Sequence, residues 1–357
     1  MTNIWFNQGY SSVRDALIMI SEAKDRTVRL LASHHDVGSP VLRAADMAFL
    51  EPGFDRSTEA GAGEYVDYCL EICRIHQVDL FVAQSGSMTL AGHKKDFAAI
   101  GTRLAVPGSA ETLALLHDKA RFYEVATAAG LPMPWTREIH DVEGFDAALK
   151  ALDALGLDAC VKPPQGVFGA GFWRLDAVHP LFETLMNPDS HRISPAALRA
   201  AIATAPPGLR LLVLEHLSGV EWSVDCVCED GRLVVGVGRR KIGRAQRIET
   251  DGPVFEVVRH AIASFGLSGL INVQCKAAGA DDGDVRLLEI NARMSGGCLY
   301  TRYSGVNLPW WHVALELGLA REDQIPAPVG GALVAPLADA LQIQAPAIGY
   351  GAAQCAS

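Results

Sequence analysis

The sequence predicts an α/β domain with a parallel sheet, followed by an α+β part in which helices mix with antiparallel hairpins. Two observations support this prediction. Over the first ~110 residues, short apolar strand candidates alternate with helical stretches, which is typical of a parallel sheet covered by helices. Further along the chain, pairs of strand candidates flank turns that contain Asp-Gly, a dipeptide typical of tight hairpins.

The composition is that of a globular protein and excludes several classes of partner. Hydrophobic residues make up 49% of the 357 residues, charged residues make up 20%, and the net charge is −10. We expect no nucleic-acid or membrane partner, because both attract basic surfaces. The eight cysteines form no Cys-x-x-Cys pair, no uncharged apolar run reaches the ~18 residues of a membrane helix, and no secretory signal is recognisable. Together these features predict a cytoplasmic protein.

Three polar loops in the α/β part are candidate walls of a substrate site. They follow the strand candidates at 4–6, 28–32 and 80–83, and a helix is predicted over 12–24. Ligands bind at the loops that follow the carboxyl ends of parallel strands, although ordinary polar turns would have the same composition. The first loop contains one glycine, where a dinucleotide site needs Gly-x-Gly-x-x-Gly. Nicotinamide and flavin binding by this domain are therefore disfavoured.

A glycine-rich loop in the next part of the chain is a candidate phosphate cradle. A helix is predicted over 109–129, and Lys162 then ends a strand and opens a loop that contains Gly166, Gly169 and Gly171. Glycines allow backbone N–H groups to converge on an anion, which the lysine ammonium neutralises. The loop should join two strands, so it differs from a Walker motif, and a plain glycine-rich hairpin is the alternative interpretation.

An apolar strand at 211–214 runs into a short linker between two acidic residues. The linker contains His216 and Leu217, and the acids are Glu215 and Glu221. Linker backbone can pair with the edge of an adenine, and a carboxylate can accept hydrogen bonds from both ribose hydroxyls. The alternative interpretation is a strand end with solvated acids.

A predicted hairpin with its turn centred near residue 281 contains the strongest candidate site. Because strand side chains alternate between faces, Glu289, Asn291 and Arg293 are expected on one face, and the register places Gln274 near Glu289. Two amide oxygens and one carboxylate are ligands that Mg²⁺ prefers, and a nucleotide triphosphate would supply most of the negative charge. Five further cations lie within 238–247, either as an anion pocket or as a solvated loop.

Taken together and in this order, these segments resemble the ATP-grasp superfamily, in particular carboxylate–amine ligases of the carbamoyl phosphate synthetase and biotin carboxylase branch. The resemblance covers about residues 1–320 and is most specific in Asn272-Val273-Gln274 and Glu289-Ile290-Asn291-Ala292-Arg293. It implies an α/β N-terminal pre-ATP-grasp domain with a parallel sheet, followed by an α+β ATP-grasp fold of two subdomains. The implied domains are 1–112 (pre-ATP-grasp), 113–217 (lid subdomain with a flap loop), 218–325 (catalytic subdomain) and 326–357 (C-terminal tail).

The resemblance also implies roles for individual residues. ATP would be bound by two lysines, the flap glycines and the hinge between the subdomains: Lys119, Lys162, Gly166, Gly169, Gly171, Glu215, His216, Leu217 and Glu221. Two Mg²⁺ ions, which Mn²⁺ can replace, would be held by Gln274, Glu289 and Asn291. Arg293 and Lys241 are the catalytic candidates. The acceptor substrate would contact residues of both parts of the chain: Gly9, Tyr10, His35, Ser85, Ser87, Arg240, Ser295 and Gly296.

The activity that the resemblance implies is ATP-dependent ligation. A small-molecule carboxylate would be phosphorylated by ATP, and an amine would displace phosphate to form an amide or peptide-like bond. An ATP-binding regulatory protein and another ATP-grasp reaction, of the carboxylase or carboxylate kinase type, are the alternatives. The chain contains no Met-Lys-Met biotin-attachment signal and one ATP-grasp unit, which favours a stand-alone ligase, with a homodimer as one possible assembly.

Overall fold

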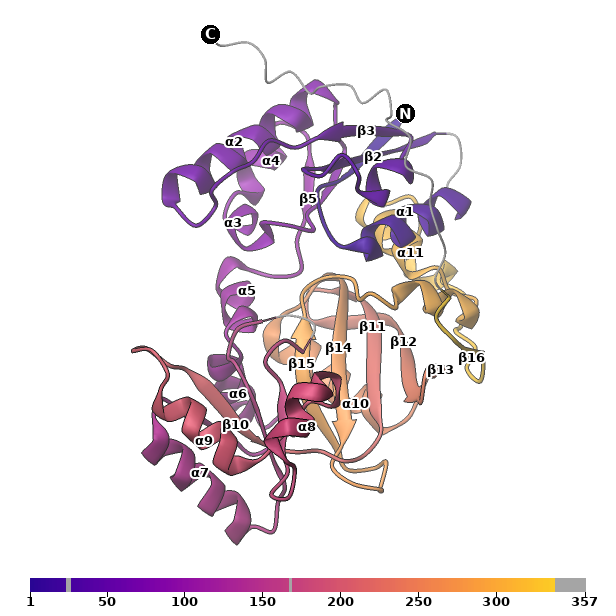
Figure 1. Ribbon diagram of the computed structural model, residues 1–357. Helices are drawn as coiled ribbons and strands as arrows, with labels where there is room; N and C mark the ends of the chain where they lie inside the picture. The colour runs from indigo at the N-terminus through magenta and orange to yellow at the C-terminus, as the bar shows by residue number, and fades with distance from the viewer. Residues whose placement is uncertain (24–26, 167–168, 338–357) are drawn as a thin grey trace. The chain divides into compact units, whose positions relative to one another are not determined.

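The computed structural model describes residues 1–23, 27–166 and 169–337 (Figure 1). The chain divides into two compact units. The first unit holds the described residues of 1–114, 222–274 and 290–357, and the second holds those of 115–221 and 275–289. In the described part of the chain, no helix combines the length and the apolar character that crossing a membrane requires.

The first unit begins with the predicted parallel sheet, whose five strands have the order β3-β2-β1-β4-β5. They are β1 (Thr2–Phe6), β2 (Val28–His34), β3 (Met47–Leu50), β4 (Leu80–Val82) and β5 (Arg103–Ala105). The chain adds strands on one side of β1 and then moves to the other side, so the strand order reverses between β1 and β4. At such a switch point the loops after the two strands diverge and leave a crevice for a ligand.

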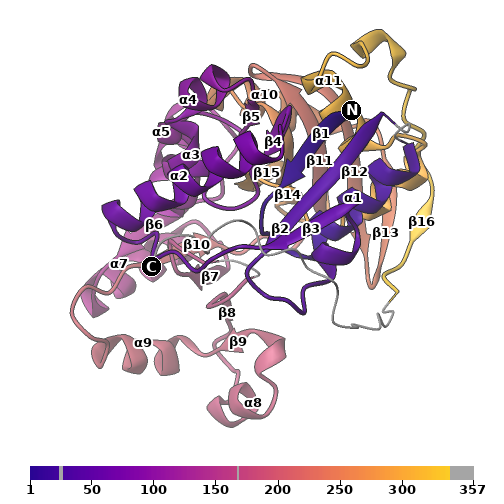
Figure 2. The ribbon, with the colours of Figure 1, turned by 90° about the horizontal axis from the view of Figure 1, so that it is seen from above.

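Helices cover both faces of this sheet, which explains why most residues of its strands are apolar (Figure 2). They are α1 (Ser11–Ala23), the 3₁₀ turn η1 (Pro40–Arg43), α2 (Glu59–Ile75), α3 (Ser87–Ala91) and α4 (Lys94–Ala99). Ile4 and Phe6 pack with α1, and Trp5 packs with α2, as the alternation of side chains requires. The predicted helix over 12–24 is therefore confirmed as far as Ala23, and Lys24 lies outside the described residues.

A second sheet has the order β15-β14-β11-β12-β13-β16, and β14 and β15 each pass from one unit into the other. Its strands are β11 (Glu221–Glu229), β12 (Arg232–Ile242), β13 (Ala245–Glu249), β14 (Gly269–Ala277), β15 (Val285–Asn291) and β16 (Leu333–Val334). The accompanying helices are α10 (Pro253–Phe265), η3 (Cys298–Ser304), α11 (Leu308–Glu316) and η4 (Glu322–Gln324). Within the first unit, apolar side chains of β12, β13 and α11 share one core with α1 and β1.

The segment 238–247 is a hairpin and not a loop, although Lys241, Arg244 and Arg247 are exposed, as the solvated interpretation expects. Strands β12 and β13 pair through this segment, and the turn lies at Gly243 and Arg244. The alternation that begins with Val235 and Val237 continues to Arg239, which is 3% exposed. The sequence pattern misled because a run of cations favours a loop unless a buried partner offsets one of the charges.

The second unit contains a sheet of order β6-β10-β7-β8-β9. Its strands are β6 (Thr136–Ile139), β7 (Ala159–Lys162), β8 (Trp173–Leu175), β9 (Arg192–Ile193) and β10 (Leu211–Glu215). Its helices are α6 (Lys119–Ala128), α7 (Val142–Ala154), α8 (Leu181–Met186), η2 (Pro188–Ser190) and α9 (Pro195–Ala203). Apolar side chains from β6, β7, β10, α7 and α9 form its core. The glycine-rich loop joins β7 to β8, as predicted.

The helix predicted over 109–129 is two helices, α5 (Ala110–His117) and α6, with a break at Asp118. Asp118 has extended backbone angles, and its carboxylate accepts hydrogen bonds from the N–H groups of Ala120 and Arg121 at 3.0 and 3.3 Å. Aspartate competes in this way with the helical backbone and starts a new helix.

The fold class predicted from the sequence is confirmed, with a parallel sheet first and mixed α+β structure after it. The predicted domain boundaries stay a prediction. The first compact unit contains residues 1–114 together with most of the sheet formed by β11 to β16. The predicted boundaries place these two parts in different domains. Residues 338–357 of the predicted C-terminal tail lie outside the described residues.

Candidate active site

The first predicted phosphate ligand, Lys119, contacts the predicted flap. It is the first residue of α6, a position fixed by the Asp118 cap, and Arg210 holds that cap with an Nη1 to Oδ2 distance of 2.9 Å. Burial favours the neutral form of Asp118, but hydrogen bonds from Arg210 and the backbone outweigh it and lower its pKa. The Nζ atom of Lys119 donates to the carbonyl oxygen of Gly166 at 2.8 Å. Lysine and flap are therefore adjacent before any nucleotide binds.

The second predicted phosphate ligand, Lys162, is fixed by a tyrosine that sequence reasoning missed. Its Nζ atom donates to the hydroxyl of Tyr123 at 2.9 Å and lies 4.8 Å from the centre of that ring. The Tyr123 hydroxyl donates in turn to the carbonyl oxygen of Leu288 at 2.8 Å. This chain of contacts anchors Lys162 to β15, one residue before Glu289. No sequence signal marks Tyr123, because its partners lie far away in the chain.

Lys119, Lys162 and Glu289 influence one another electrostatically, and we call these three residues the charge cluster. Burial lowers the pKa of both lysines, and the negative charge of Glu289 opposes this effect at each of them. Two ammonium groups around one carboxylate leave an excess of positive charge. Such a cluster attracts the phosphates of a nucleotide.

The predicted flap requires glycine at its C-terminal end, at Gly171. Gly171 has a φ of +75°, and a Cβ atom there would lie 2.8 Å from Cδ of Pro163. Gly166 and Gly169 also have positive φ angles, and Val167 and Phe168 of the predicted flap lie outside the described residues. Backbone in such conformations can present N–H groups to an anion, which agrees with the predicted cradle.

The predicted nucleotide hinge is held by its own polar groups. The Oε2 atom of Glu215 accepts a hydrogen bond from the N–H of Trp135 at 3.1 Å, and the N–H of His216 donates to the carbonyl oxygen of Asp158 at 2.7 Å. The buried Nδ1 atom of His216 has no partner among the described residues. Burial lowers the pKa of His216 to about 4, so its ring is neutral at physiological pH. Leu217 is buried, and Glu221 is partly exposed at the start of β11.

Replacing Gly219 by alanine is expected to destabilise the second unit by about 1–3 kcal/mol, the usual effect of overpacking. A Cβ atom on Gly219 would lie 2.1 Å from the carbonyl oxygen of Gly279. Gly279→Ala is the matched control, because a Cβ atom there meets nothing within 4 Å. Thermal unfolding of both variants checks the prediction. Equal melting temperatures for the two variants would contradict the close packing of the hinge.

The three predicted metal ligands lie on neighbouring strands of one sheet. Gln274 belongs to β14, and Glu289 and Asn291 belong to β15. The N–H of Ala278 donates to the carbonyl oxygen of Asp284 at 2.9 Å, which centres the turn at residue 281, as predicted. All three side chains are partly exposed. Within the described residues, no three or more His, Cys, Asp or Glu side chains gather as a metal site, and the predicted metal ligands stay a prediction.

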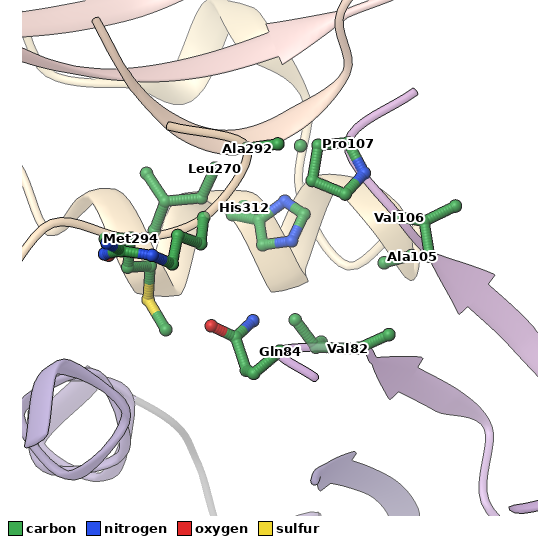
Figure 3. Close-up of a pocket in the computed structure, with 12 residues that line it drawn as sticks. Val82, Gln84, Ala105, Val106, Pro107, Leu270, Ala292, Met294 and His312 are labelled. Atoms are coloured by element: carbon green, nitrogen blue, oxygen red, sulfur yellow. The ribbon is translucent and has the colours of Figure 1, made fainter. Parts of the chain in front are cut away.

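Arg293 is not placed by strand alternation, because β15 ends at Asn291. Its guanidinium lies 4.8 Å from the ring centre of Tyr10, and its Nη1 donates to the carbonyl oxygen of Met294 at 3.1 Å. The structure therefore brings together a predicted catalytic residue and a predicted substrate residue. Arg293 also lines a pocket of about 20 Å³ together with Gln84 and His312 (Figure 3), which has space for roughly one water molecule.

A buried network around Arg239 lies in the first unit and was not predicted. The Nε atom of Arg239 donates to Oδ2 of Asp225 at 2.8 Å, and its Nη2 donates to the hydroxyl of Ser295 at 2.8 Å. The same hydroxyl donates to Oδ1 of Asp225 at 2.7 Å, which also accepts from Asn272 at 3.1 Å. Gly297 must be glycine, because a Cβ atom there would lie 2.2 Å from Nη1 of Arg239. The sequence signal that could have indicated this network is an acidic residue, Asp225, inside the apolar strand at 222–228.

This network bears on the predicted substrate residues near it. The hydroxyl of Ser295 already has two protein partners, whereas the neighbouring Gly296 is exposed. Arg240 lies 3.7 Å from Glu249 and stacks over Trp222 at 5.6 Å. Lys241, the second catalytic candidate, is exposed on β12. Its catalytic role stays a prediction.

The substrate residues predicted in the parallel sheet meet at the switch point between β1 and β4. Asn7 is fully buried, and its Oδ1 accepts from the N–H groups of Gln84 and Ser85 at 2.6 and 3.2 Å. Gly9 lies against Gln84, since a Cβ atom on Gly9 would be 3.1 Å from the Cβ of Gln84. A side-chain contact between His35 and Gln8 ties the loop after β2 to the loop after β1. Ser87 begins α3 in the loop after β4.

Comparison with known proteins supports the predicted superfamily. Residues 209–340 match the family described as ATP-grasp in the biosynthetic pathway with Ter operon. Over 249 residues, the chain is 23% identical to the large chain of carbamoyl phosphate synthase from Pasteurella multocida (strain Pm70). That match covers 63% of this chain and 21% of the relative, so the chain spans about a fifth of the length of this curated relative.

Solved structures share the fold along most of the chain. N5-carboxyaminoimidazole synthetase from Staphylococcus aureus, complexed with ADP, has a TM-score of 0.62 at 13% identity, covering 91% of this chain and 80% of its own. L-amino acid ligase from Bacillus licheniformis has a TM-score of 0.60 at 13% identity, covering 92% of this chain and 78% of its own. The family match and the curated relative support the predicted resemblance to the ATP-grasp superfamily, and the chain shares its fold with N5-carboxyaminoimidazole synthetase and L-amino acid ligase.

Proposed function

We propose that this protein is an ATP- and Mg²⁺-dependent ligase that activates a carboxylate as an acyl phosphate for attack by an amine. The observation that carries the proposal is the placement of Lys119 and Lys162 within the second unit, the first beside the flap and the second beside β15, which contains Glu289. One lysine already contacts the flap, and the other is fixed by Tyr123. Phosphoryl transfer depends mainly on such positioning of charge, with little covalent assistance from the protein.

The donor set around Glu289 fits magnesium. Carboxylate and amide oxygens are hard ligands, and Gln274, Glu289 and Asn291 offer one carboxylate and two amides on adjacent strands. Bound Mg²⁺ would neutralise phosphate charge, and Mn²⁺ would serve as a substitute. The protein itself contributes the two ammonium groups and the glycine-rich flap. We expect the flap to exclude water, because an acyl phosphate is readily hydrolysed.

Arg293 is the proposed stabiliser of the charge that develops on the transferring phosphoryl group. Its contact with the Tyr10 ring and its bond to a backbone carbonyl restrict the guanidinium before substrate binds. Such preorganisation is the main source of electrostatic catalysis. We propose no covalent intermediate on the protein, because the amine can attack the acyl phosphate directly.

The products expected are an amide or peptide-like compound, ADP and phosphate. An L-amino acid ligase is among the solved structures with this fold, which supports the proposal of a ligation product. The alternatives are a carboxylate kinase, a carboxylase-type reaction and an ATP-binding regulatory protein. The reaction products distinguish them.

A screen for ADP release tests the proposal. Small carboxylates and amines, amino acids included, are offered in pairs with Mg-ATP, and products are identified by mass spectrometry. Release that requires both partners, with a new amide in equal amount, is the expected result. Release with the carboxylate alone would indicate a kinase. ATP binding without turnover on any pair would favour the regulatory protein.

Replacing Lys162 by methionine is expected to raise the KM for ATP by about 10-fold or more, because a charge-assisted contact to phosphate is lost. Methionine keeps much of the side-chain volume beside Tyr123. Lys150→Met on α7 is the control, because Lys150 is exposed. Initial rates of ADP release at varied ATP check the prediction. An unchanged KM for ATP in Lys162→Met would remove this lysine from the nucleotide site.

A further inference from the structure

Arg56 lies at the switch point of the parallel sheet, in the loop between β3 and α2. Its guanidinium carbon lies 4.8 Å from the ring centre of Tyr65, and its Nη1 donates to the hydroxyl of Ser85 at 2.8 Å. The side chain is half-buried. Among the residues that the structure describes, Arg56 makes no ion pair with an acidic side chain. An arginine held in place at an edge of a parallel sheet where ligands bind, with donors left over, is well suited to bind an anionic ligand.

The surroundings of Arg56 are built to hold it in this position. Tyr65 is fully buried, and its hydroxyl accepts a hydrogen bond from Nδ2 of Asn7 at 2.6 Å. Asn7 also donates to the carbonyl oxygen of Ser85 at 2.8 Å, so one buried amide fixes both partners of Arg56. Because these contacts are already formed, little side-chain entropy remains to be lost when a ligand binds.

Glycine is required beside the arginine. Gly86 has a φ of +69°, and a Cβ atom there would lie 2.8 Å from Cε1 of Tyr65 and 3.0 Å from Nη1 of Arg56. Any larger residue at this position would push the guanidinium off the ring. The glycine therefore leaves the space that Arg56 occupies.

One acidic side chain, Glu51, is close enough to Arg56 to oppose an incoming anion. Its Oε1 accepts from the hydroxyl of Ser33 at 2.6 Å and from the N–H of Gln8 at 2.9 Å. Glu51 is 5% exposed, and burial raises its pKa above the usual range. Its remaining oxygen, Oε2, is buried without a partner among the described residues. Arg56 is half-buried whereas Glu51 is buried, so Arg56 is the more accessible of the two charged residues.

We propose that Arg56 binds a carboxylate group of one of the substrates, so that the ligase is specific for a small molecule that carries a free carboxylate. The planar fork of arginine matches a carboxylate in two parallel hydrogen bonds. That the bound molecule is a substrate rests on the proposed function. The binding site itself is inferred from the geometry around Arg56.

Ligand-dependent thermal stability tests this site without ATP. The probes are the standard L-amino acids and succinate, each compared with its carboxamide, at millimolar concentration. We expect at least one carboxylate to raise the melting temperature of the wild-type protein while its carboxamide does not. Arg56→Gln should weaken that binding about tenfold or more, since hydrogen bonds to a charged group are lost.

Two further variants separate recognition from structural damage. Arg56→Lys keeps the charge without the fork and should bind more weakly than the wild-type protein and more tightly than Arg56→Gln. Arg74→Gln, an exposed arginine near the end of α2, should bind like the wild-type protein. Equal binding by Arg56→Gln and wild-type protein, stabilisation by carboxamides as strong as by carboxylates, or no stabilisation by any probe would overturn the proposal. The ADP-release screen decides the proposed function separately, because thermal stabilisation needs no turnover.

Discussion

Glu289→Gln is expected to reduce kcat for ADP release by ~10²-fold or more, the scale of losing one charge-stabilising group in a phosphoryl-transfer site. Glutamine preserves the shape of the side chain and removes its charge. Two consequences follow from the charge cluster. The proposed metal site loses its carboxylate, and Lys119 and Lys162 lose the negative charge that raises their pKa. Steady-state rates at varied Mg²⁺ measure the loss of kcat and the Mg²⁺ concentration that the reaction requires. This required concentration is expected to rise.

Glu256→Gln is the matched control for this variant, because Glu256 is exposed on α10 and pairs with Arg259 on the surface. It should retain the wild-type rate. Calorimetric titration with ATP, with and without Mg²⁺, adds a readout that is independent of turnover. If Glu289→Gln kept both the rate and the Mg²⁺ dependence of the wild-type protein, the proposed metal site would have to be abandoned.

Arg239→Met is expected to destabilise the protein by about 3–5 kcal/mol, the usual effect of leaving one partner of a buried ion pair alone. Asp225 is fully buried, and among the described residues Ser295 and Asn272 would remain as its side-chain hydrogen-bond donors. The fluorescence of the buried Trp5 and Trp222, both in the first unit, follows unfolding in denaturant.

Two further variants make this prediction specific to the buried pair. Arg259→Met removes an exposed ion pair and should change stability by less than about 1 kcal/mol. The double variant Asp225→Leu with Arg239→Met removes both charges and should be more stable than Arg239→Met alone. The prediction would be contradicted if Arg239→Met were as stable as Arg259→Met, or if the double variant were less stable than Arg239→Met. Either result would show that the buried ion pair does not determine the loss of stability.

The sequence predicted elements whose signals are local. Alternating apolar strands and helices indicated the parallel sheet, and the hairpin that contains Gln274 and Glu289 has the predicted turn. The glycine loop after Lys162 joins two strands, as expected. These predictions hold because periodicity, turn residues and capping act over a few residues. Asp118 shows the limit of such signals, since a helix pattern continues through it while its carboxylate caps a new helix.

By itself, the sequence determined the fold class, the parallel sheet and the resemblance to ATP-grasp proteins, because these depend on local patterns and on chemistry carried by single side chains. Only the tertiary structure decided which of them meet. Tyr123 reaches Lys162 and Leu288, Arg239 reaches Asp225, and Arg56 reaches Ser85. Such pairs depend on strand order and register, which bring distant residues together and which no short stretch of sequence encodes.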